Sequence, residues 1–168
     1  EKSSGYKLGN KVVTSATYMA VTANPRATQA GCEVLSAGGT AADAAVAVQM
    51  VLGLVEPQST GLGGGAFTLY YKANTKQVFS YDGRETAPAA ATENYLRYIS
   101  DTNQTNPLPA LSSSFASTRA SGRSIGTPGA VKMLELLHQD HGQKSWDTLF
   151  DPAIELATNG FGISGRMA

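Results

Sequence analysis

Cysteine and an excess of charge of either sign are what this sequence most clearly lacks. Its single cysteine, Cys32, cannot form an intramolecular disulfide, so a disulfide-bonded scaffold is excluded. We interpret Cys32 as a small apolar residue within a helix, because no activating base or cation is predicted beside it. Lysine and arginine together number 13, and aspartate and glutamate also number 13, with no block of either sign. This balance disfavours nucleic acid and anionic membranes as partners and favours small molecules or proteins.

A long hydrophobic run is also lacking, because the most apolar stretch covers only residues 41–55. A helix of this length spans roughly 24 Å, and strand signals follow it closely, so we do not expect a membrane span. Only Asp43, Gln49 and Gly53 interrupt its apolar surface, which predicts a helix buried on all sides. Thr40 and Asp43 have the spacing of a capping box at its start.

The remaining pattern predicts helices layered on an antiparallel sheet, an α+β fold. Apolar residues alternate on both sides of a turn at 73–76, directly after a glycine-rich turn at 61–65, which is typical of a β-hairpin. A capping residue followed by proline indicates the starts of several helices. The predicted strands lie at residues 12–13, 18–21, 67–71 and 78–81, and the predicted helices at 25–37, 41–55, 92–99, 128–141, 146–150 and 151–159.

The chain has the length of one domain or of a large part of one, and neither a linker nor an internal repeat divides it. Residues 101–126 are rich in serine, threonine, asparagine and proline and carry few large apolar side chains. A stretch of this length without a regular pattern predicts a surface or binding loop.

Three features have the composition of functional motifs but not the context. A phosphate-binding loop needs a strand before it and a helix after it, whereas the glycine turn at 61–65 follows a helix. We expect it to pack tightly against neighbouring backbone. Ser59 and Thr60 lie outside any G-x-S-x-G nucleophile elbow. His138 and His141 have no carboxylate partner at ligand spacing, so we favour a rim histidine and a cation near a helix C-terminus over a metal pair.

Two strings of the sequence resemble the large subunit of γ-glutamyltranspeptidases, also called γ-glutamyltransferases. The first is EPQSTGLGGG at residues 56–65, and the second is DGRETAP at residues 82–88, after the predicted hairpin. The resemblance extends from about residues 24–25 to the end of the chain, where DPAIELA at 151–157 and GFGIS at 160–164 are similar to further family segments. It therefore covers most of the chain.

The resemblance implies part of an αββα N-terminal nucleophile hydrolase sandwich, with residues 1–168 as a single incomplete domain from the N-terminal portion of the large subunit. It implies an enzyme that cleaves γ-glutamyl amides such as glutathione and transfers the γ-glutamyl group to water, amino acids or peptides through a threonine ester. That threonine lies in the small subunit, outside this chain, and its own α-amine serves as the base. The expected partners are the γ-glutamyl substrate, the remainder of the large subunit and the small subunit. No cofactor or metal is expected, and the protein is expected to be periplasmic or secreted with its leader removed.

Arg84, at the exit of the hairpin, is the residue to which the resemblance gives a role. A guanidinium binds a carboxylate through two parallel hydrogen bonds, which lysine cannot reproduce. From the residues alone, a surface ion pair with Asp82 or Glu85 is the favoured interpretation. The resemblance reverses this preference, because the arginine of the family's motif binds the α-carboxylate of the γ-glutamyl group. We therefore expect Arg84 to bind substrate and no residue of this chain to be catalytic, so the chain alone should be inactive.

Two other functions stay open at this point. Within the enzymes, related acylases that act on β-lactam side chains or on polyglutamate share the scaffold. Outside them, the chain is compatible with a stand-alone carboxylate-binding module that keeps Arg84 without a nucleophile.

Overall fold

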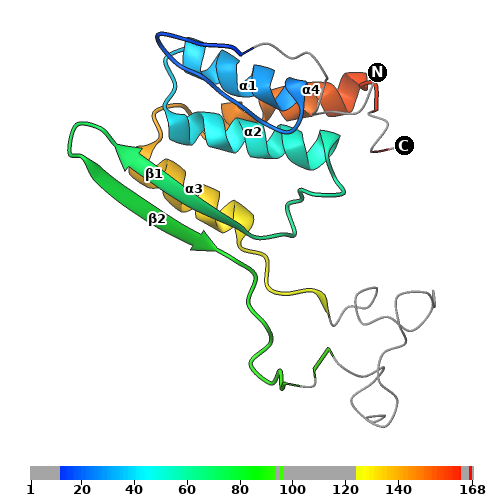
Figure 1. The fold of residues 1–168 in the computed structure, drawn as a ribbon. Helices are drawn as coiled ribbons and strands as arrows, with labels where there is room; N and C mark the ends of the chain where they lie inside the picture. Colours follow the sequence, from blue (N-terminus) through cyan, green and yellow to red (C-terminus); the bar gives the residue numbers. More distant parts are fainter. Residues whose placement is uncertain (1–11, 94, 97–123, 164–166, 168) are drawn as a thin grey trace.

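Helices pack in layers on one face of a β-hairpin in the computed structural model, which describes residues 12–93, 95–96, 124–163 and 167 (Figure 1). The predicted α+β class is confirmed. α3 lies against the hairpin, α2 packs on α3, and α1 and α4 pack on α2. Within the described residues the elements are α1 (Pro25–Ser36), α2 (Ala41–Val55), β1 (Ala66–Lys72), β2 (Gln77–Gly83), α3 (Ala130–His141), the 3-10 helix η3 (Asp147–Phe150) and α4 (Asp151–Asn159).

The two N-terminal helices begin and end at the predicted signals. Asn24 Oδ1 accepts a hydrogen bond from the Arg26 N–H at 3.0 Å. Gly38 follows α1 with a φ of 78°, a backbone conformation that favours glycine. Thr40 and Asp43 form the capping box at the start of α2, with Asp43 N–H bonded to Thr40 Oγ1 at 3.2 Å and Thr40 N–H to Asp43 Oδ2 at 2.7 Å.

α2 is the buried helix that its sequence predicts, and it lies between two clusters of apolar side chains. Each buried aliphatic side chain contributes about 1.5–3 kcal/mol to folding. Cys32 lies in α1, as predicted, but is half-buried. No described helix is both long enough and apolar enough for a membrane span. Two apolar clusters lie beside α2. The cluster towards α3 comprises Ala42, Val46, Met50, Met133, Leu134, Leu137 and Leu149. The cluster towards α1 comprises Ala27, Ala30, Val51 and Val55.

β1 and β2 pair antiparallel, with Ala66 opposite Gly83 at one end and Lys72 opposite Gln77 at the other. The hairpin faces α3 with Ala66, Tyr70 and Tyr81, which pack on the core. The opposite face exposes Phe67, Leu69, Tyr71 and Val78. The predicted alternation along the strands is thus confirmed. Arg84 directly follows β2, a strand that packs on α3.

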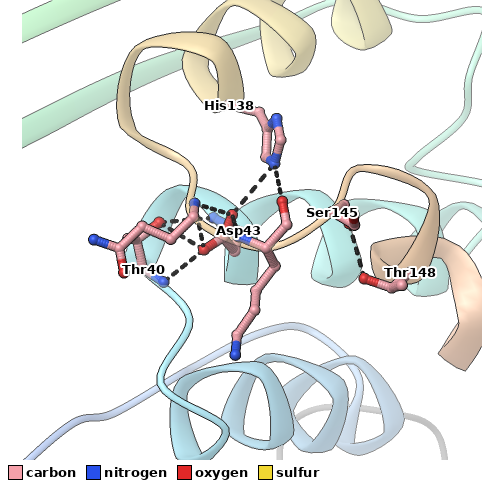
Figure 2. Close-up of polar contacts among 7 residues, drawn as sticks. Thr40, Asp43, His138, Ser145 and Thr148 are labelled. Atoms are coloured by element: carbon pink, nitrogen blue, oxygen red, sulfur yellow. Dashed lines mark hydrogen bonds and ion pairs between the residues drawn. The ribbon is translucent and has the colours of Figure 1, made fainter.

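His138 and His141 both lie in the last turn of α3, but they contact different groups. His141 stacks on Tyr70 with ring centroids 4.0 Å apart. His138 Nε2 lies 2.9 Å from the Lys144 carbonyl oxygen and 3.4 Å from Asp43 Oδ1 (Figure 2). In the part of the chain that the structure describes, no three His, Cys, Asp or Glu side chains are grouped as metal ligands.

Tyr81 of β2 is joined to α3 by a hydrogen bond from its hydroxyl to Asp140 Oδ2 at 2.7 Å. Burial, and then this hydrogen bond and the charge of Asp140, raise the pKa of Tyr81 from 10.0 to about 12. The raised pKa means that folding favours the neutral phenol. Its contribution to stability is complete below pH 10 and is lost as the pH rises through about 12.

We predict that an ultraviolet phenolate titration contains a component near pH 12 that Tyr81→Phe removes. Asp140→Asn should move this component towards pH 10 but not fully, because burial is the larger cause. The prediction fails if Tyr81→Phe removes a component at the ordinary pKa instead.

No strand forms at residues 12–13 or 18–21, contrary to the prediction. A strand requires a hydrogen-bonded partner, and in the described part of the chain the hairpin is the only sheet. The segment lies beside α1 instead, where a Cβ built on Gly31 would lie 3.2 Å from Ala20 Cβ. Its large apolar side chains are exposed, and Ala20 is the residue that lies against the helix.

The predicted start of α3 at Thr127-Pro128 is also wrong, because the helix begins at Ala130. Thr127 is held in an extended bridge opposite Thr86, which leaves it unable to cap a helix. The Ala130 N–H donates to the Gly64 carbonyl oxygen at 3.1 Å. The free N–H group at the start of α3 therefore donates to a backbone carbonyl of the glycine turn and not to a local side chain.

The short helix expected after Ser145 is η3, but the Ser145 side chain does not cap it. Ser145 contributes its carbonyl oxygen, which accepts from Thr148 Oγ1 at 2.8 Å (Figure 2). Residues 93, 95 and 96 of the helix predicted at 92–99 form turns, and 97–99 lie outside the described residues. Residues 101–123 of the predicted loop also lie outside them. α4 ends as predicted at Gly160, whose φ is 76°.

Candidate substrate-binding site

Arg84 is the first residue after β2, and its backbone is fixed by the turn that leaves the strand. The Arg84 N–H donates to Asp82 Oδ1 at 2.9 Å, an Asx turn of the kind that reverses a chain locally. The Arg84 side chain is 65% exposed, and its Nη1 lies 2.6 Å from Glu85 Oε2. The surface ion pair that the residues alone favour is therefore present.

Arg84 also lines a cavity of about 410 Å³. Glu85 and Gly63 lie beside it, and Leu96 and Ile125 supply apolar wall. The lining of the cavity thus combines the positively charged Arg84 guanidinium with apolar side chains. This combination suits a small molecule that has a carboxylate and an aliphatic body. The ion pair with Glu85 and the cavity coexist, so the binding role of Arg84 stays a prediction that the geometry permits.

The Glu85 carboxylate contacts both the Arg84 guanidinium and the glycine turn at 61–65. Its pKa is lowered below 4.5, first by a hydrogen bond from its own backbone N–H, then by the charge of Arg84 and by a backbone hydrogen bond from Gly65. A Cβ built on Gly65 would lie 2.8 Å from Glu85 Cδ and 2.7 Å from the Gly83 carbonyl oxygen. Glycine at position 65 is therefore needed for the close approach. The predicted tight packing of the turn is confirmed at Gly65, whereas a Cβ on Gly61 or Gly63 would meet nothing within 4 Å.

A segment distant in the sequence, residues 126–130, completes the surroundings of Arg84. The Gly129 and Ala130 N–H groups donate to the Gly64 carbonyl oxygen at 3.2 and 3.1 Å. A Cβ on Gly129 would lie 2.8 Å from the Gly83 carbonyl carbon. Sequence reasoning missed this segment, although the two glycines that flank Thr127-Pro128 could have indicated a close backbone approach.

The Gamma-glutamyltranspeptidase family profile matches residues 27–168 of this chain. The chain belongs to the γ-glutamyltranspeptidase family. The glutathione hydrolase proenzyme of Bacillus subtilis (strain 168) is 37% identical over 150 residues, which are 89% of this chain and 24% of that protein. The chain thus spans about a quarter of the length of this γ-glutamyltranspeptidase relative.

Solved structures agree with the family assignment. The γ-glutamyltranspeptidase of Helicobacter pylori superposes with a TM-score of 0.78 at 35% identity, covering 94% of this chain and 42% of that chain. A cephalosporin acylase from Bacillus halodurans superposes with a TM-score of 0.67 at 27% identity, covering 86% of this chain and 24% of that one. The helices and hairpin are therefore part of the N-terminal nucleophile hydrolase fold of the γ-glutamyltranspeptidases.

Ser59 and Thr60, the hydroxyl residues closest to the glycine turn in sequence, have a structural place in this member of the γ-glutamyltranspeptidase family. Their N–H groups each donate to the Glu56 carbonyl oxygen at 3.0 Å. They thereby close the C-terminus of α2, where the last carbonyls of a helix need donors.

Proposed function

We propose that this chain supplies the carboxylate-binding arm of a γ-glutamyltransferase that cleaves γ-glutamyl amides such as glutathione. The nucleophilic threonine would lie in a small subunit outside this chain. The observation that carries the proposal is the position of Arg84, at the end of a supported strand and on the wall of a cavity of about 410 Å³, in a chain of this family. Cleavage of the glutathione γ-amide also accords with the name of the glutathione hydrolase relative.

Arg84 has hydrogen-bonding capacity for the substrate beyond its ion pair. A guanidinium carries five N–H groups in a fixed plane. In the described part of the chain, Glu85 engages Nη1, which leaves the Nε and Nη2 edge to bind the α-carboxylate of a γ-glutamyl group in a bidentate manner. Glu85 would then orient the guanidinium plane while the substrate occupies its other edge.

In the proposed reaction, the threonine hydroxyl oxygen attacks the γ-carbonyl carbon of the substrate. The hydroxyl proton passes to the threonine α-amine and then to the leaving amine, and a γ-glutamyl ester remains. Water or the amine of an amino acid or peptide next attacks the ester, which releases glutamate or a new γ-glutamyl amide and restores the hydroxyl. Arg84 transfers no proton and acts by holding the substrate in place.

Turnover of a chromogenic γ-glutamyl anilide tests this division of labour. We expect the complete two-subunit protein to release the aniline from this substrate and the isolated 168-residue chain to release none, because the proposed attacking group lies outside this chain. Turnover by the isolated chain would refute the proposal. Loss of the anilide activity when the threonine of the small subunit is replaced by alanine is the matched control.

An acylase is the second candidate, favoured by the superposition on the cephalosporin acylase at a TM-score of 0.67. A glutaryl amide keeps the carboxylate that Arg84 would bind but lacks the α-amine of a γ-glutamyl group. Activity of the complete protein on a glutaryl amide, without activity on the γ-glutamyl anilide, would select the acylase. A non-catalytic module would instead bind glutamate as the isolated chain and lose that binding in Arg84→Ala, as calorimetry can measure.

A further inference from the structure

Residues 126 and 127 contact the chain immediately after Arg84. The Thr127 N–H donates to the Thr86 carbonyl oxygen at 3.1 Å, within the isolated antiparallel bridge of these two residues. Beside this bridge, a Cβ built on Gly126 would lie 2.7 Å from Glu85 Cβ and 3.1 Å from the Thr86 carbonyl oxygen. The backbone at position 126 therefore approaches Glu85 more closely than any other residue type permits.

The chain immediately before Arg84 is held by the other end of the same segment. Gly129 lies against Gly83, where an added Cβ would lie 2.8 Å from the Gly83 carbonyl carbon and 3.1 Å from its Cα. Gly83 itself is buried. The segment of residues 126–130 thus touches the residues on both sides of Arg84, although 41 residues lie between Arg84 and Gly126 in the sequence.

We propose that the segment of residues 126–130 positions Arg84 for substrate, with Gly126 as the positioning residue. This inference rests on the function proposed above. An arginine side chain has several rotatable bonds, so an exposed guanidinium needs an external support to hold one orientation. Glu85 supplies that support through its 2.6 Å contact with Nη1. Gly126 in turn fixes the Cβ of Glu85 by close approach, so a displacement at position 126 passes directly to the guanidinium.

Gly126→Ala is the variant that tests this role. Its Cβ would have to move from 2.7 Å to the ordinary contact distance of 3.4–4 Å from Glu85. The backbone angle of Gly126 is not in the left-handed region, so the substitution acts through the close contacts of its Cβ with Glu85 and with the Thr86 carbonyl oxygen. A displacement near 1 Å of a positioning group costs roughly 10- to 100-fold in rate at limiting substrate.

The experiment compares two donors with the complete two-subunit protein, a γ-glutamyl anilide and its analogue with an α-carboxamide in place of the α-carboxylate. Rates are normalised to active enzyme by the burst of released aniline, so that partial misfolding does not enter the result. We expect Gly126→Ala to lower kcat/KM for the carboxylate donor roughly 10- to 100-fold, mainly through KM. The carboxamide donor should change less than about two-fold, because it is uncharged and has one acceptor oxygen where the carboxylate has two, so it cannot form the bidentate ion pair with Arg84. Gly53→Ala is the control, since its Cβ would meet nothing within 4 Å.

Equal losses on both donors would overturn the inference, because a merely structural role affects every substrate alike. Unchanged kinetics on both donors would overturn it as well. If Gly126→Ala yields no active enzyme, Thr127→Pro, which removes the N–H that Thr86 accepts, must give the same selective loss. Arg84→Ala distinguishes failure of the proposed function from failure of the positioning role of Gly126. If Arg84→Ala does not reduce the preference for the carboxylate donor, the proposed function fails. If it does and Gly126→Ala does not, only the positioning role fails.

Discussion

Arg84→Ala should lower kcat/KM of the complete two-subunit protein for a γ-glutamyl anilide by roughly 10²- to 10³-fold. Two charge-assisted hydrogen bonds to the α-carboxylate together contribute about 3–4 kcal/mol, and each 1.36 kcal/mol corresponds to a factor of ten. The loss should fall mainly on KM, because the α-carboxylate is bound alike in the ground and transition states. Arg84→Lys should recover little, since an ammonium cannot reproduce the planar fork.

Lys132 offers a matched control for Arg84. Both side chains are 65% exposed, and each has an ion pair of 2.6 Å, Lys132 with Glu135 and Arg84 with Glu85. Lys132 does not line the cavity of about 410 Å³, but together with Arg84 it lines a second cavity of about 380 Å³. If the carboxylate binds in the first cavity, Lys132→Ala should leave both kinetic parameters almost unchanged. Similar losses in Lys132→Ala and Arg84→Ala would mean that general surface charge, and not a bound carboxylate, explains the effect.

The elements that could be predicted from the sequence are those whose signals are local. The capping box of Thr40 and Asp43 and the apolar surface that follows it lie within one helix, and the structure agrees with both. The start of α3 could not be predicted, because its cap is the carbonyl oxygen of Gly64, far away in the sequence. The segment around Tyr18 has strand composition, yet it forms no strand, because a strand needs a partner and the only sheet in the described residues is the hairpin.

For the candidate site, the sequence located Arg84 but not the groups that hold it. The local interpretation, an ion pair with Glu85, and the family interpretation, an arginine facing a cavity, are both present in the geometry. Gly126 and Gly129 were not recognised, because a glycine that lets two distant backbones meet looks in sequence like any loop glycine. Contacts of this kind depend on the packing of α3 against the hairpin.

Asp43 joins three parts of the chain through a carboxylate that is 0% exposed. In addition to the Thr40 N–H of the capping box, it accepts hydrogen bonds from Thr40 Oγ1 at 3.0 Å, the Gln143 N–H at 3.0 Å and the Lys144 N–H at 3.3 Å. Figure 2 shows these donors converging on Asp43 from the start of α2 and from the loop after α3, with His138 beside them. The carboxylate therefore replaces water for several buried donors at once.

Asp43→Ala should consequently lower the free energy of unfolding by about 3–5 kcal/mol, because it leaves these donors buried without an acceptor. Asp43→Asn should cost less, about 2 kcal/mol, since one oxygen remains while the new amide group faces N–H donors. Urea unfolding of the complete protein, followed by a probe of this region such as Trp146, measures both. Asp147→Asn is the control, because Asp147 is exposed and should change the free energy by less than about 0.5 kcal/mol. A loss for Asp43→Ala no larger than that for Asp147→Asn would mean that the loop after α3 is held by its apolar neighbours and not by the carboxylate.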